Sequence, residues 1–80
     1  MNKSQRTLLA VKKGECVQIK EINEQEDLKR RLLELGLIRG TKVRVLRVAP
    51  FQNEMAIYFR HYELCLPKSI LNTIIVENEQ

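Results

Sequence analysis

The sequence predicts a mainly β protein, a small bent antiparallel barrel that carries one short α-helix. Several short segments alternate apolar and polar side chains with a period of two, as strands of a half-buried antiparallel sheet do. One segment, residues 28–35, instead places its leucines at helical spacing. A small sheet that closes into a barrel also removes the open edges through which strands aggregate.

The helix is predicted from three leucines. Leu28, Leu32 and Leu35 stand at i, i+4 and i+7, so they line one face of a helix and are expected in the core. The polar residues 23–27 precede them, and Asn23 or a nearby acidic side chain is expected to cap the first turn.

Two glycines are expected to turn the chain from this helix into a strand. Gly36 follows the last leucine, where a helix ends most easily in a left-handed residue without a Cβ atom. Gly40 supplies a second sharp bend. From Thr41 the pattern has period two, because Val43 and Val45 alternate with basic residues.

The remaining elements are predicted from alternation and turn residues. After Val45 the apolar parity changes, which indicates a β-bulge, a strong bend or a strand buried on both sides. A tight hairpin turn is expected over residues 60–62. The five expected strands cover residues 15–22, 41–48, 55–60, 63–66 and 73–77. One domain is expected over residues 7–77, with frayed ends at 1–6 and 78–80.

Composition indicates a soluble globular protein. Hydrophobic residues make up 44% and charged residues 30% of the 80 residues, and no apolar run approaches the ~20 residues of a membrane-spanning helix. The apolar start is too short for a signal peptide, and two cysteines make no disulfide framework. A cytoplasmic protein is therefore expected. The net charge of +4 favours an anionic neighbour.

No catalytic motif is present, and we predict no catalytic residue, metal or cofactor. His61, Glu63 and Cys65 alternate along one stretch and could be read as metal ligands. The alternative is a turn histidine, a solvated glutamate and a small strand residue. We prefer the alternative, because zinc sites need about three or four protein ligands.

The basic residues allow two interpretations. Residues 29–31 are expected to be a solvated helix face. Together with other cations they could instead form a surface for nucleic acid, an anionic membrane or an acidic protein. The further cations are Lys42, Arg44 and Arg47, and the aromatic residues that could stack on bases are Tyr58, Phe59 and Tyr62.

One stretch of the sequence resembles a known family. The pattern R-L-x-x-L-G-L-x-x-G runs from Arg31 to Gly40, and it is followed by V-x-V, A-P, L-x-L and I-x-V patterns. This order is similar to that of the FeoA family, over the range from Leu8 to Val76. The later residues of the match are Val43, Val45, Ala49, Pro50, Leu64, Leu66, Ile74 and Val76.

The sequence departs from the family pattern in two turns. Gln52-Asn53-Glu54 stands where the family usually has G-D-P, and His61 stands where a glycine is common. Histidine tolerates a positive φ better than most residues, so the hairpin turn is expected to survive.

The resemblance implies an SH3-like fold, which also occurs as the C-terminal domain of iron-dependent repressors. It implies a small cytosolic accessory protein of bacterial ferrous-iron uptake, not an enzyme. Its expected partner is the FeoB-type GTPase transporter, with no small-molecule substrate, and its membrane contact is peripheral and through that partner. The family is linked to transition metal ions, but iron uptake does not require that this chain hold iron.

The expected partner-binding surface lies where the helix ends. Leu37 and Ile38 stand between the two glycines, where one of them is expected to stay exposed beside basic residues. The alternative is that both staple the helix to the sheet. The candidate contact residues are Arg31, Leu37, Ile38, Arg39 and Tyr62. The runner-up function is a small nucleic-acid-binding barrel, and a third is a small metalloenzyme.

Overall fold

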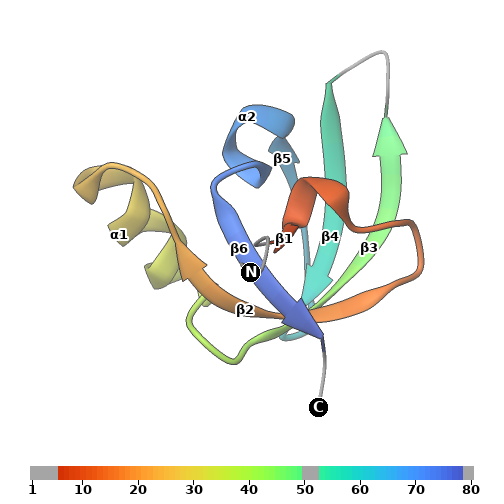
Figure 1. The fold of residues 1–80 in the computed structure, drawn as a ribbon, viewed down its shortest axis with the longest axis horizontal. Coiled ribbons are helices and arrows are strands. Elements are labelled where there is room, and N and C mark those ends of the chain that lie inside the picture. Colours follow the sequence, from red (N-terminus) through yellow and green to blue (C-terminus); the bar gives the residue numbers. More distant parts are fainter. Residues whose placement is uncertain (1–5, 50–52, 79–80) are drawn as a thin grey trace, which may run out of the picture.

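A computed structural model describes residues 6–49 and 53–78, which form one bent antiparallel sheet with a helix at its side (Figure 1). The strands are β1 (Arg6–Thr7), β2 (Cys16–Ile22), β3 (Lys42–Ala49), β4 (Glu54–Phe59), β5 (Tyr62–Pro67) and β6 (Ile74–Asn78). The helices are the 3-10 helix η1 (Leu8–Ala10) and the α-helices α1 (Glu26–Leu35) and α2 (Lys68–Leu71).

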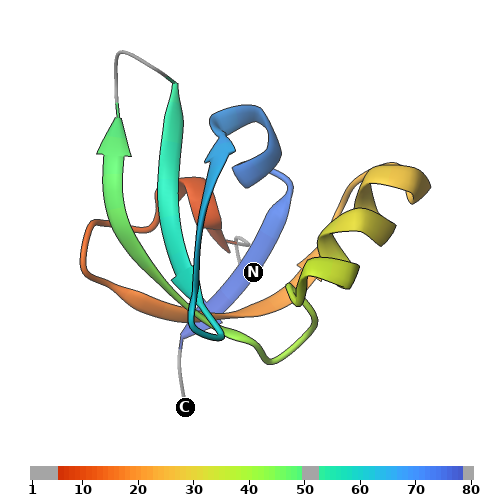
Figure 2. The same cartoon turned by 180° about the vertical axis from the view of Figure 1, so that it is seen from behind.

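The sheet order is β1-β6-β2-β3-β4-β5, and every neighbouring pair is antiparallel. The mainly β fold class with one short helix is confirmed, and the strong bend of the sheet gives it the shape of a small barrel (Figure 2). The sequence predicts a sheet that closes into a barrel. Instead, β1 and β5 are the edges of this sheet, so hydrogen bonds do not close it.

The sheet has one strand more than predicted, and it reaches further at both ends. Residues 8–10 form η1, while Arg6 and Thr7 form β1 and pair with β6. Asn78 pairs with Val17. Arg6 and Asn78, expected in frayed ends, therefore belong to the sheet, and residues 1–5 and 79–80 lie outside the described part of the chain.

The change of parity after Val45 is a β-bulge. The register between β3 and β4 shifts between Val45 and Arg47, which leaves Leu46 without a partner across the ladder. Leu46 is half-buried and Val48 is exposed. The alternative of a strand buried on both sides is therefore wrong. Residues 50–52, which include Pro50 of the A-P pattern, lie outside the described residues.

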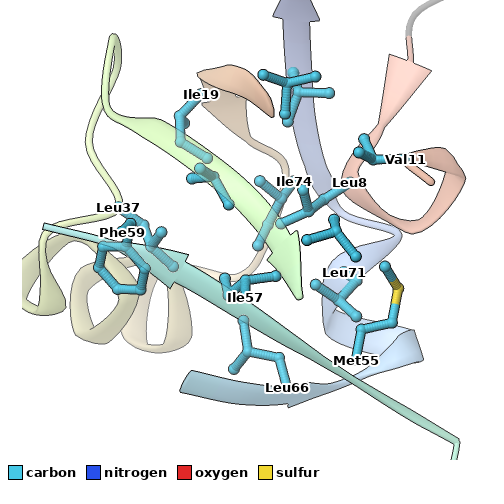
Figure 3. Packing of buried hydrophobic residues seen from close by; sticks show 14 of the residues in the cluster. Leu8, Val11, Ile19, Leu37, Met55, Ile57, Phe59, Leu66, Leu71 and Ile74 are labelled. Atoms are coloured by element: carbon cyan, nitrogen blue, oxygen red, sulfur yellow. The ribbon is translucent and has the colours of Figure 1, made fainter. Parts of the chain in front are cut away.

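The core lies inside the bend of the sheet (Figure 3). η1 and α2 cover the end that lies opposite the β4–β5 turn (Figure 1), and each contributes one fully buried leucine. The buried cluster consists of Leu8, Val11, Val17, Ile19, Ile22, Leu32, Leu37, Val43, Val45, Met55, Ile57, Phe59, Leu66, Leu71, Ile74 and Val76.

One member of the predicted helical stripe is not in the core. Leu32 is buried and Leu28 packs against the cluster, but Leu35 is 48% exposed. α1 stands at the side of the sheet with its last turn nearer to the sheet (Figure 1), and there Leu35 lines an open hollow beside β5 instead of entering the core. Leu37, after the helix, fills the core position instead and is fully buried.

The predicted cap of α1 is also wrong. α1 begins after Gln25, and no side chain accepts a hydrogen bond from its free N–H groups in capping geometry. The N–H of Asn23 donates to the carbonyl of Thr73 at 2.7 Å, which fixes this residue beside β6. The first turn carries Glu26 and Asp27, where the helix dipole favours negative charge.

We predict that Glu15 makes stability sensitive to acid. Arg6 Nη2 donates to Glu15 Oε2 at 2.6 Å, and the Lys12 N–H donates to Oε1 at 3.0 Å. The hydrogen bond from Arg6 and then that from Lys12 lower the pKa of Glu15 below its ordinary value of 4.5. Since the folded pKa is depressed, this stabilisation is complete above pH 4.5 and is lost as the pH falls through the folded pKa.

Glu15→Gln is therefore expected to lower stability at pH 7 and to change it much less at pH 3. Urea unfolding at the two pH values measures this difference. Glu21→Gln, at an exposed position of β2, is the matched control. An equal effect of Glu15→Gln at both pH values would contradict the assignment.

Candidate interaction surface

The β4–β5 hairpin has a two-residue turn with unusual backbone geometry. Phe59 pairs with Tyr62, and the two residues between them, Arg60 and His61, have φ values of 49° and 69°. Positive φ at both central positions is the type I′ arrangement that favours Asn-Gly. The predicted tight turn is confirmed, but side chains with a Cβ atom occupy both left-handed positions, at roughly 1–2 kcal/mol each.

The helix exit is fixed by its two glycines, as predicted. Gly36 has φ 111°, its N–H bonds to the Leu33 carbonyl, and the N–H of Leu37 bonds to the Leu32 carbonyl. This pair of hydrogen bonds defines a Schellman motif, which brings Leu37 back onto the last turns of the helix. Gly40 has φ 91° and its N–H donates to the carbonyl of Ile19 on β2 at 2.8 Å.

The hairpin turn and the helix exit meet at one end of the molecule (Figure 2). A Cβ atom built on Gly36 would lie 3.0 Å from Cδ of Arg60 and 3.6 Å from the Phe59 ring. The absence of a side chain at Gly36 therefore gives Arg60 room to lie across the end of α1. A cation there is favourable, because the carbonyl end of a helix carries partial negative charge.

Two shallow hollows adjoin Arg60. One lies over the loop between α1 and β3, where Ile38 and Arg39 are exposed, and the other lies over the outer face of β3 and β4. Lys42 and Arg60 line both hollows. We call this surface the basic face, and it consists of Ile38, Arg39, Lys42, Arg44, Tyr58 and Arg60.

An apolar cavity lies on the other side of the hairpin. It has a volume of about 220 Å³ and lies between the end of α1 and β5. Leu35 and Tyr62 are 48% and 64% exposed at its mouth. The Tyr62 ring lies 6.3 Å from the Phe59 ring, a normal distance for a tilted aromatic pair. The remaining lining residues are Glu34, Glu63 and Leu64.

The structure separates the five candidate contact residues. Ile38 and Arg39 are exposed and line the same hollow, with 44% of Ile38 accessible. Tyr62 lines the apolar cavity. Leu37 is fully buried, so only the alternative interpretation, a staple between helix and sheet, fits it. Arg31 is exposed on α1 but lines none of these hollows.

Sequence reasoning missed Arg60 on the basic face and Leu35 at the mouth of the apolar cavity. The signal for Arg60 was present, because a two-residue hairpin turn needs positive φ and neither central residue is Gly or Asn. Helical spacing alone predicts Leu35 in the core.

Within residues 6–49 and 53–78, no three His, Cys, Asp or Glu side chains lie close enough to hold a metal ion. Of the three possible ligands on the hairpin, Glu63 instead forms an ion pair with Arg47. Cys65 is exposed on β5. Cys16, on β2, accepts a hydrogen bond from Arg44 Nε at 3.2 Å.

The bent six-stranded sheet and its single long helix define a small SH3-like β domain with an exposed basic face. The FeoA domain family matches residues 6–78 of the sequence. The chain therefore belongs to the FeoA family, as its resemblance implied.

Solved structures agree with this assignment. The FeoA protein from Chlorobium tepidum superimposes with a TM-score of 0.85 and 27% identity, over 91% of this chain and 70% of that one. The iron(II) transport protein A from Clostridium thermocellum gives a TM-score of 0.84 at 22% identity, over 91% of this chain but 45% of that one.

A manganese-dependent transcriptional repressor shares the fold alone, at 18% identity and a TM-score of 0.83. The match covers 98% of this chain and 44% of the repressor. No curated protein matches the chain by sequence. No helix in the described part of the chain is long and apolar enough to cross a bilayer.

Proposed function

We propose that this protein is a non-enzymatic accessory protein of bacterial ferrous-iron uptake. The observation that carries the proposal is the FeoA family match, which spans residues 6–78 and so covers nearly the whole chain. Structural relatives named for iron(II) transport support the same process. The likeness to repressors is of the fold alone and supports no role in binding DNA.

The proposed mode of action is a protein–protein contact with a FeoB-type GTPase transporter at the cytoplasmic side of the membrane. The exposed residues at the helix exit support a contact rather than a reaction. Ile38 is an accessible apolar side chain beside the charged Arg39. An apolar group rimmed by charge suits a regulated interface of modest affinity.

Affinity purification from native membranes tests this proposal. The tagged full chain is expected to capture a transporter that carries a GTPase domain. Ile38→Glu and Arg39→Glu are expected to reduce that capture while leaving the melting temperature close to that of the parent, because both side chains are exposed.

Lys68→Glu is the matched control for Arg39→Glu, since it also reverses a positive charge. It lies on α2, at the opposite end of the molecule from the β4–β5 turn (Figure 2). It is expected to capture the transporter as the parent does. Failure of the parent chain to capture any GTPase-bearing transporter would refute the proposed function. Full capture by folded Ile38→Glu and Arg39→Glu would move the contact away from the helix exit.

A further inference from the structure

The outer edge of β5 is a strand edge without a neighbouring strand. β5 pairs with β4 alone and stands at one end of the strand order. The other edge strand, β1, is only two residues long, so β5 offers the longer of the two edges. An edge strand presents backbone N–H and C=O groups to which a further strand can be added.

The hairpin geometry shows which backbone groups of β5 point outward. In a two-residue hairpin the residues that flank the turn exchange backbone hydrogen bonds, so Tyr62 bonds to β4, and such bonds recur at every second residue. The N–H of Lys68 agrees with this parity, because it donates to the Asn53 carbonyl at 3.0 Å. The N–H and C=O groups of Glu63 and Cys65 therefore point away from β4.

These outward groups are available for pairing. Within the described part of the chain, no backbone hydrogen bond joins Glu63 or Cys65 to a segment beyond the β4–β5 ladder. The Glu63 carboxylate is ion-paired with Arg47, but this contact does not use the backbone groups of Glu63. The edge ends at Pro67, which has no N–H to donate. Residues 62–66 can therefore accept an added strand.

The apolar cavity lies beside this edge, and Tyr62 and Leu64 of β5 line it. A residue added opposite Leu64 points its side chain to the same face of the sheet, because directly opposite cross-strand residues share a face. That side chain therefore enters the cavity, toward Leu35 at the end of α1. The volume of about 220 Å³ suits one aliphatic side chain rather than a larger ligand.

We infer that β5 binds an extended segment of a partner protein by strand addition, with an aliphatic side chain in the cavity and a lysine or arginine beside Glu34. Glu34 lines the cavity, is exposed, and forms no ion pair within the described part of the chain. A cation two residues from the aliphatic side chain lies on the same face of the added strand, and its long stem can reach Glu34. This surface is separate from Ile38 and Arg39, so the inference goes beyond the proposed function.

A second copy of the chain fits this edge less well than a cationic segment. Paired with another β5, the edge would receive Tyr62, Leu64 and Leu66 on the cavity face, and none of them carries a charge to meet Glu34. Each copy also carries a net charge of +4, which opposes association. A nucleic acid has no backbone array that extends a sheet, and it would set phosphates against Glu34.

The probe is a short end-capped peptide in which two lysines flank an isoleucine, with one threonine between each lysine and the isoleucine. When the isoleucine lies opposite Leu64, the threonines lie opposite Glu63 and Cys65 and exchange hydrogen bonds with them. N-methylation of both threonines removes two donors and is expected to weaken binding roughly tenfold. N-methylation of the isoleucine, whose N–H points away from β5, is the control and is expected to weaken binding much less.

Cys65→Pro tests the same edge from the protein side. It removes an outward N–H and leaves the ladder to β4 intact, so it is expected to weaken peptide binding about fivefold. Cys65→Ser, the matched control, keeps the N–H and is expected to bind as the parent does. Glu34→Gln removes the carboxylate at an exposed position and is expected to weaken binding about threefold. Circular dichroism checks that each variant is folded, and the methylated peptides test the edge without changing the protein.

The experiment is an NMR titration of the isotope-labelled full chain with each peptide and, separately, with a short DNA duplex. The parent peptide is expected to shift the amide signals of residues 33–36 and 62–66 in a saturable way. It is also expected to slow hydrogen exchange at the amides of Glu63 and Cys65, because both become hydrogen-bonded. Sedimentation equilibrium of the chain alone measures self-association.

Five results would overturn the inference. Strand addition is wrong if the peptide does not bind saturably, or if methylation of the threonines leaves its affinity unchanged. The cationic segment is wrong if Glu34→Gln binds as tightly as the parent. The choice of occupant is wrong if DNA binds the same residues more tightly, or if the chain alone self-associates through the amides of β5. Membrane capture is assigned to Ile38 and Arg39, so its outcome is scored separately from all of these.

Discussion

Truncating Leu37 to alanine is expected to lower the free energy of unfolding by about 2–5 kcal/mol. The side chain is fully buried and belongs to the core cluster, where Figure 3 shows it at the same end as Phe59. It also completes the Schellman motif, whose hydrogen bond joins its N–H to the Leu32 carbonyl. For a domain of this size the loss is a large share of total stability. Chemical denaturation followed by circular dichroism measures it.

The neighbouring residue provides the control. Ile38 is also apolar and lies in the same loop, but it is 44% exposed, so Ile38→Ala is expected to change stability by no more than about 0.5 kcal/mol. Equal losses for Leu37→Ala and Ile38→Ala would contradict the burial that separates them. The pair also decides which of the two apolar residues between the glycines can contact a partner without unfolding the protein.

The helix exit could be predicted from sequence because its determinants are local. A leucine stripe followed by Leu-Gly-Leu specifies a helix that ends in a left-handed residue, and the structure has Gly36 at φ 111°. The strand that follows is likewise specified by the alternation of Val43 and Val45. The bulge after Val45 is visible in the sequence as a change of parity. The sequence alone also allows a strong bend or a strand that is buried on both faces.

The errors arose where tertiary placement overrides a local pattern. Helical spacing places Leu35 on the same face as Leu32, but it cannot show that Leu35 lies over an open hollow beside β5 and stays exposed. The turn residues indicate an unusual backbone at Arg60, but no residue type shows that its side chain lies beside the end of α1, because that place follows from the close approach of the hairpin to Gly36. The sequence therefore indicates the loop between the two glycines, but not the residues of α1 and of the hairpin that the structure places beside it.

Replacing Gly36 by valine is expected to destabilise the protein by about 2–4 kcal/mol, because it combines two effects. A β-branched residue strongly disfavours φ 111°, which only glycine adopts readily. In addition, the new Cβ atom would lie 3.0 Å from Cδ of Arg60, so the arginine side chain must move away from the end of α1. Thermal and chemical denaturation measure the total loss.

Gly40→Val separates the two effects. Gly40 has a similar φ of 91°, but no atom outside its chain neighbours lies within 4 Å of a Cβ built there, so its substitution adds backbone strain without a collision. A greater loss at Gly36 than at Gly40 would measure the contact with Arg60. Equal losses would mean that Arg60 moves aside freely. In that case the arginine would not be fixed across the helix end.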